Sequence, residues 1–119
     1  MEENITVDPK DAQDNKVMAI LAYFGILVLV PLLAAKESPF ARFHANQGLL
    51  LIIALIAYSI VATILIFVFV FVSPALALIA TLLNLVYLVF LVLAIIGIIN
   101  AAKGEAKELP IIGKYKIIK

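Results

Sequence analysis

A run of 60 consecutive residues, from Phe43 to Ala102, contains no Asp, Glu, Lys or Arg. Most of these residues are Leu, Ile, Val, Phe or Ala. A water-soluble domain covers its surface with charged side chains, and a run of this length cannot be hidden inside a chain of 119 residues. The medium around this stretch must therefore be lipid, and the sequence predicts an all-α integral membrane protein.

Three apolar segments are long enough to cross a bilayer as helices. The first covers residues 17–35, about 28 Å of helix, which matches a hydrocarbon core of ~30 Å. The second covers residues 48–72, with a helix that can begin as early as residue 39, and the third covers residues 75–102. We expect three transmembrane helices over residues 17–102, the last two forming a long hairpin. For residues 17–35 the alternative is a helix that lies at the membrane surface.

Local signals set the ends of the two long helices. Ser38 offers an N-cap hydroxyl and Pro39 a φ angle that is already helical. Ser73 and Pro74 end the second helix, because proline cannot continue a helix and disfavours helical geometry in the residue before it. Gly104 is a C-terminal cap for the third helix.

The two ends of the chain carry opposite charge. Residues 1–16 hold five acids and two lysines, which predicts a disordered acidic tail. Residues 103–119 hold five lysines and two acids, which suits a basic tail lying on anionic lipids at the cytoplasmic surface. With three spans, seven basic residues fall on the side of the C-terminus and two on the other side. The positive-inside rule then predicts a multi-pass protein of the cell membrane with its N-terminus outside and its C-terminus in the cytoplasm.

The start of the second helix holds the most varied side chains in the apolar half of the chain. Aromatic and polar residues alternate there, namely Phe40, Arg42, Phe43, His44, Asn46 and Gln47. One interpretation is an interfacial anchor, because aromatic rings and a snorkelling Arg belong at that depth. The other is a polar site that faces a groove or a partner. His44 is the only histidine and the chain has no cysteine, so we expect no metal site and no cofactor.

Among the polar side chains within the predicted spans, four stand out: Tyr58, Thr63, Asn84 and Tyr87. A buried amide or hydroxyl in a membrane usually finds a partner on a neighbouring helix, which predicts helix-packing seams. The alternative is a substrate or proton path lined by these four residues. The absence of charge from the spans argues against ion coupling and against catalysis.

Two motifs carry a family resemblance. The string from Ser38 to Gln47 and the exit motif with Gly104, Glu105 and Pro110 resemble the small, uncharacterised prokaryotic membrane proteins grouped with the Tic20-like proteins, after a component of chloroplast protein import. The resemblance implies a membrane-embedded helical fold and a role associated with protein translocation. It also implies that Phe40, Arg42, His44 and Gln47 are the motif positions.

These observations lead to a functional hypothesis. We expect a non-enzymatic membrane protein, an accessory or scaffold subunit that acts through helix–helix contacts. The alternative is a minimal transporter or pore built from several copies of the chain. The expected partners are the lipid bilayer and either further copies or another membrane protein, and no nucleic acid.

Overall fold

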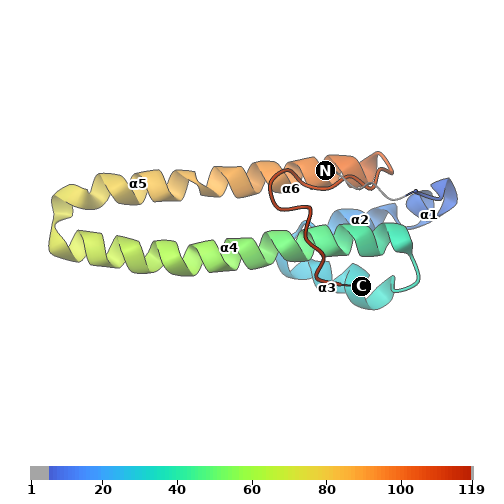
Figure 1. Ribbon diagram of the computed structural model, residues 1–119, viewed down its shortest axis with the longest axis horizontal. Helices are drawn as coiled ribbons and strands as arrows, with labels where there is room; N and C mark the ends of the chain where they lie inside the picture. The colour runs from blue at the N-terminus through green and yellow to red at the C-terminus, as the bar shows by residue number, and fades with distance from the viewer. Residues whose placement is uncertain (1–5, 119) are drawn as a thin grey trace.

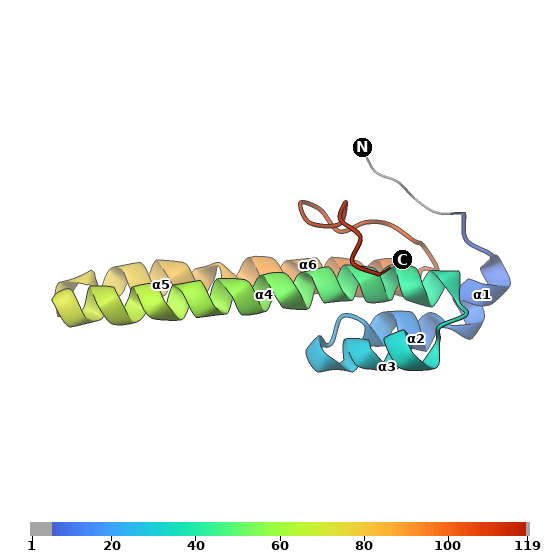
Figure 2. The same ribbon diagram turned by 60° about the horizontal axis from the view of Figure 1, so that its bottom comes forward.

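A hairpin of two long antiparallel helices runs the length of the molecule (Figures 1 and 2). The first arm is α4 (Pro39–Val72), and the second is made of η2 (Pro74–Leu76), α5 (Ala77–Leu85) and α6 (Tyr87–Ala102). The computed structural model describes residues 6–118, and every regular element in that range is helical. The predicted all-α class and the long hairpin are confirmed.

Both arms are long and apolar enough to cross a membrane. Their outward side chains are large and apolar, and they lie open: Phe67 is 74% exposed, Phe71 90% and Leu78 68%. A soluble protein would not leave so large an apolar surface in water. The molecule is 57 Å long, so it extends beyond a hydrocarbon core of ~30 Å.

The predicted ends of the long helices are confirmed. The Ser38 hydroxyl accepts a hydrogen bond from the Ala41 amide at 3.0 Å, and α4 stops at Val72 before the Ser73–Pro74 turn. At the other end, Gly104 adopts a positive φ of 73° just past the C-cap of α6. The amide of Gly104 donates to the Ala101 carbonyl, and the next amide donates to Asn100, which satisfies the last turn of the helix.

Two tyrosines join the arms of the hairpin near its middle. The Tyr58 hydroxyl donates to the Leu83 carbonyl at 2.5 Å, and the Tyr87 hydroxyl donates to the Ser59 hydroxyl at 3.1 Å. The two tyrosine rings meet edge to face with their centroids 5.4 Å apart. The break between α5 and α6 falls at Val86, one turn after the carbonyl that accepts the Tyr58 hydroxyl. These reciprocal bonds pin the register of the two arms inside the apolar part of the chain.

Residues 17–35 do not form the single transmembrane helix that the sequence predicts. They form the short helices α2 (Lys16–Leu21), η1 (Gly25–Val28) and α3 (Leu29–Ala34), and α2 and α3 lie side by side beneath α4 in Figure 2. The chain reverses at Gly25, which adopts a φ of 61° that favours glycine. Six residues of helix reach only about 9 Å, far less than a hydrocarbon core. This corrects the expectation of a third span.

Small residues let this short hairpin approach the long one closely. Ala19 and Ala22 are buried, at 0% and 1% exposure. A Cβ atom at Gly48 of α4 would overlap the Ala22 carbonyl, and one at Gly97 of α6 would overlap the ring of Tyr23. Both glycines are therefore required for their size, because each accommodates part of α2 or of the turn after it.

Replacing Gly97 by leucine should displace the Tyr23 ring and lower the free energy of unfolding by about 1–3 kcal/mol, the usual cost of overpacking. Unfolding of the purified protein in mixed detergent micelles would measure the change. Ala57→Leu, at an exposed position of α4, is the matched control and should leave stability nearly unchanged. Equal stability of the two variants would contradict this packing.

Candidate functional site

The first ten residues of α4, from Pro39 to Gly48, form what we call the head of the hairpin. They extend for about 15 Å and carry the predicted aromatic and polar motif. The C-terminal tail packs beside the head, and its exposed lysines Lys114 and Lys116 flank a residue that bonds to it, Tyr115. Lysine ammonium groups stay out of hydrocarbon, so the head and the tail together form the polar end of the hairpin.

His44 is the centre of the head and is fully buried, at 0% exposure. Its Nε2 lies 2.8 Å from the Glu105 carbonyl, which can only accept, so Nε2 carries the proton. Nδ1 therefore accepts from the Tyr23 hydroxyl at 2.6 Å. The rings of Phe40 and Phe43 meet the imidazole edge to face, with centroids 4.9 and 5.3 Å away. His44 thus joins the short hairpin, α4 and the start of the tail, and both of its nitrogens are occupied within the chain.

Gln47 fixes a turn of the tail. Its Oε1 accepts from the Leu109 amide at 2.8 Å, and its Nε2 donates to the Gly113 carbonyl at 2.9 Å. The amide of Gly113 closes the turn on the Leu109 carbonyl at 3.0 Å. Ile111, at the apex, has a positive φ of 73°, a conformation that is strained for a β-branched residue and needs support from its surroundings. The Gln47 amide supplies that support because it brackets the turn on both sides.

Asn46 holds the end of the tail in the same way. Its Nδ2 donates to the Tyr115 carbonyl at 2.9 Å, and its Oδ1 accepts from the amides of Ile117 at 2.6 Å and Ile118 at 3.2 Å. The tail after α6 has no regular secondary structure within the described residues, so its backbone groups need other partners. The polar side chains of the head are those partners.

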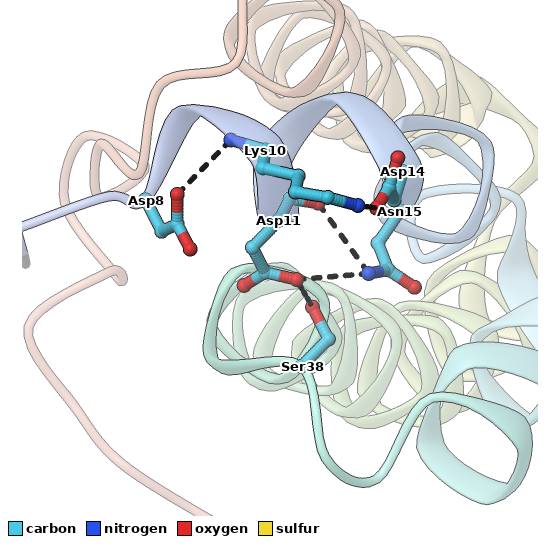
Figure 3. A network of polar contacts seen from close by, with 6 residues as sticks. All are labelled: Asp8, Lys10, Asp11, Asp14, Asn15 and Ser38. Carbon is cyan, nitrogen blue, oxygen red and sulfur yellow. Dashed lines mark hydrogen bonds and ion pairs between the residues drawn. The ribbon is translucent and has the colours of Figure 1, made fainter.

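The helix α1 (Pro9–Asp14) lies within residues 1–16, where the sequence predicts a disordered tail; residues 1–5 are outside the described part. Asp8 caps this helix, since its carboxylate accepts from the Lys10 amide at 3.1 Å. Lys10 and Asp14 form an ion pair one turn apart at 2.9 Å. Figure 3 shows the network of polar contacts around this helix. The signal for it was Asp8 followed by Pro9, an N-cap and a proline at the first helical position.

Asp11 connects α1 to the start of α4 (Figure 3). One carboxylate oxygen accepts from the Ser38 hydroxyl at 2.5 Å and from Asn15 at 2.8 Å, and the other accepts from the Phe40 amide at 3.1 Å. Partial burial raises the pKa of Asp11, but hydrogen bonds, led by the one from Ser38, outweigh it and hold the pKa below its ordinary value. These contacts therefore stabilise the fold at neutral pH and are lost as the pH falls through that lowered pKa.

The remaining predicted residues fall into two places. Around the head, Arg42 and Phe43 are half-buried, Gly104 and Glu105 follow α6, and Pro110 is exposed in the Gln47-bound turn. The four intramembrane residues separate: Tyr58 and Tyr87 meet between the arms, whereas Thr63 and Asn84 are exposed on the outside. Within one chain, those four side chains therefore do not lie along one path.

The head is a structural clasp. Its buried amides and imidazole bind backbone groups of the same chain, and within residues 6–118 no three His, Asp or Glu side chains gather in a way that could hold a metal ion. Sequence reasoning singled out His44 and Gln47 but missed Tyr23 and Asp11. Nothing in the local sequence around those two residues indicates a partner 21 to 29 positions away.

An exposed apolar hairpin with a polar head tied to its own tail defines a small helical membrane protein. The chain belongs to the magnetosome magnetite crystal formation protein family, whose family model matches residues 14–116. No solved structure matches the chain.

Three curated relatives are similar over shorter segments. The magnetosome protein MamF of Magnetospirillum gryphiswaldense is 43% identical over 54 residues, which cover 43% of this chain and 49% of the relative. MamF of Paramagnetospirillum magneticum is 51% identical over 35 residues, 29% of this chain and 32% of the relative. MmsF of the same organism is 49% identical over 35 residues, which cover 29% of this chain and 33% of the relative. The chain thus spans about half or less of the length of these relatives.

The resemblance to Tic20-like proteins is wrong, because the family model that matches most of the chain is the magnetosome one. The motifs that suggested it, the string from Ser38 to Gln47 and the exit after Gly104, lie in the clasp. Tying a tail to a helix is a structural task that unrelated hairpins can share, so these residues do not specify translocation.

Replacing Gln47 by alanine should release the tail, because it leaves the Leu109 amide and the Gly113 carbonyl without their buried partner. We expect a loss of about 2–4 kcal/mol in the free energy of unfolding. Protease cleavage between residues 106 and 118 should also become faster. Gln13→Ala, at an exposed position of α1, is the matched control. Unchanged protection of the tail in Gln47→Ala would contradict the clasp.

Proposed function

We propose that this protein is a non-enzymatic accessory subunit of the magnetosome membrane, which supports magnetite crystal formation by holding other membrane components through helix–helix contacts. The observation that carries the proposal is the outer surface of the long hairpin: it is apolar, exposed along both arms, and 36 Å or about 24 residues long below the head. Membership of the magnetosome family supplies the setting.

The distribution of polar groups supports a scaffold role. The buried polar side chains of the head bind the chain itself, as do the hydroxyls of Tyr58 and Tyr87. Ser73 and Pro74 form the tip of the hairpin, and no charged residue lies between Phe43 and Ala102. The tip thus brings no carboxylate to the far side of the membrane, where it could bind iron, so contacts within the membrane are the better candidate for its action.

The proposal includes an orientation. All nine basic residues precede Phe43 or follow Ala102, and the tip of the hairpin carries none. The expectation of an outside N-terminus rested on three spans, whereas two spans bring both ends of the chain to the same side. By the positive-inside rule that side is the cytoplasm. The tail lysines then lie where anionic lipids are enriched.

In this orientation, the short hairpin of α2 and α3 lies on the cytoplasmic side of the membrane. It docks at Gly48 and Gly97, the level where the head meets the apolar run. Its outer side chains are large and apolar, with Ile26 75% and Leu33 66% exposed. A shallow insertion into the cytoplasmic leaflet covers these side chains without a third crossing.

Cysteine labelling tests the orientation. The chain has no cysteine, so single cysteines at Thr6, Ala75 and Lys116 can be labelled with a membrane-impermeant maleimide in intact and inverted vesicles. Positions 6 and 116 should react from the cytoplasmic side and position 75 from the opposite side. Ile64→Cys, exposed on α4 at mid-membrane depth, should react from neither side. Labelling of positions 6 and 116 from opposite sides would restore the three-span arrangement.

Deletion of the gene, in a host strain that forms magnetite, tests the functional proposal. We expect crystals that are altered in size or number, restored by the wild-type gene. The purified protein in liposomes should pass neither ferrous ions nor small solutes. Normal crystals in the deletion strain would contradict a role in crystal formation, and solute flux through the liposomes would contradict the scaffold in favour of a pore.

A further inference from the structure

Asn84 is a polar side chain in the place where a membrane protein tolerates it least. It lies on α5, ten residues beyond Pro74, which corresponds to about 15 Å from the tip of the hairpin. That is the middle of a hydrocarbon core of ~30 Å. The side chain is exposed, and it makes no hydrogen bond within residues 6–118.

The fold of one chain leaves this amide facing lipid. The sequence predicts that Asn84 would find a partner on the neighbouring helix, but the seam between the arms is occupied by Tyr58 and Tyr87 instead. An amide in hydrocarbon without a hydrogen-bond partner is costly, so a partner from outside the chain would stabilise it.

The surface around Asn84 suits another helix. Ala77, Thr81 and Leu88 lie on the same face at spacings of seven, three and four residues, and all three are exposed. Alanine and threonine are small enough to let a second helix approach closely on the tip side of the amide. Leu88, 56% exposed, supplies apolar contact on the other side.

We propose that this face, defined by Ala77, Thr81, Asn84 and Leu88, binds the same face of a second copy of the chain in the membrane. The proposal rests on the membrane placement above, which cysteine labelling tests separately. The charge distribution inserts every copy in one orientation, so two copies are related by a two-fold axis along the membrane normal. A residue beside such an axis meets its own counterpart.

An asparagine satisfies this geometry by itself. Its side chain carries both a donor and an acceptor, so two Asn84 amides can each donate to the other. A side chain with only a donor or only an acceptor would face an identical group at the axis and could not form a hydrogen bond with it. The self-complementary chemistry of the amide therefore favours a second copy over an unrelated partner.

Disulfide trapping tests the interface with Asn84 left in place. Leu88→Cys should give a disulfide-linked dimer when native membranes are treated with copper phenanthroline. Leu82→Cys is the control: it is also 56% exposed and lies about 3 Å from Asn84 along the helix, but about 160° around the helix from it, and should give little dimer. Adding Asn84→Leu to Leu88→Cys should lower the dimer yield about tenfold, and Asn84→Gln should largely retain it.

Each contrary result has a distinct meaning. Equal crosslinking at positions 82 and 88, or a yield unaffected by Asn84→Leu, would overturn the interface. A crosslink from position 88 to a different membrane protein would overturn the second copy as the occupant. Because the side chain of Asn84 makes no hydrogen bond within residues 6–118, Asn84→Leu should leave the far-ultraviolet circular dichroism and the tyrosine-linked hairpin unchanged, which excludes misfolding as the cause.

Discussion

Hydrocarbon admits neither unpaired charge nor unpaired backbone groups, and this constraint arranges the whole molecule. Two long helices satisfy it, because each helix bonds its own backbone. Every Asp, Glu, Lys and Arg lies before Phe43 or after Ala102. A hairpin returns the chain to the side where it started, so all of this charge gathers at one end. The remaining elements, α1, the short hairpin and the tail, are assembled there around the head of α4 (Figure 1).

At that end a different problem arises, since the tail after α6 has no helix or sheet to pair its backbone. The backbone of α4 does not need the side chains of His44, Asn46 and Gln47, so these are available to bind the tail. Asp11 does the reverse, since a side chain from a distant helix completes the N-terminus of α4. These polar side chains are thus used in assembly, and the large surface that stays exposed is the apolar outside of the hairpin.

Much of the hairpin could be predicted because its signals are local. Ser38 and Pro39 start α4, Ser73 and Pro74 end it, and Gly104 caps the second arm. The path of residues 17–35 could not be predicted in the same way. Its length and apolarity fit a span, but Gly25 reverses it, and the space that receives it exists only because Gly48 and Gly97, far along the chain, lack side chains. The family was not predicted correctly either. The motif that suggested Tic20-like proteins holds the tail against α4, and this structural role does not specify one function.

The sequence by itself indicated a membrane protein with a long helical hairpin and showed where the two arms of that hairpin begin and end, but it also predicted a third span that the structure does not form. Composition and capping residues act over one or two helical turns, so both can be recognised from the sequence alone. Only the tertiary structure decided which polar side chains face inward. Tyr58 and Tyr87 turned toward each other while Asn84 turned outward, although all three lie in similar apolar surroundings. Rotation of a helix about its axis depends on the fit against its neighbour, and an almost uniformly apolar helix carries little information about that rotation.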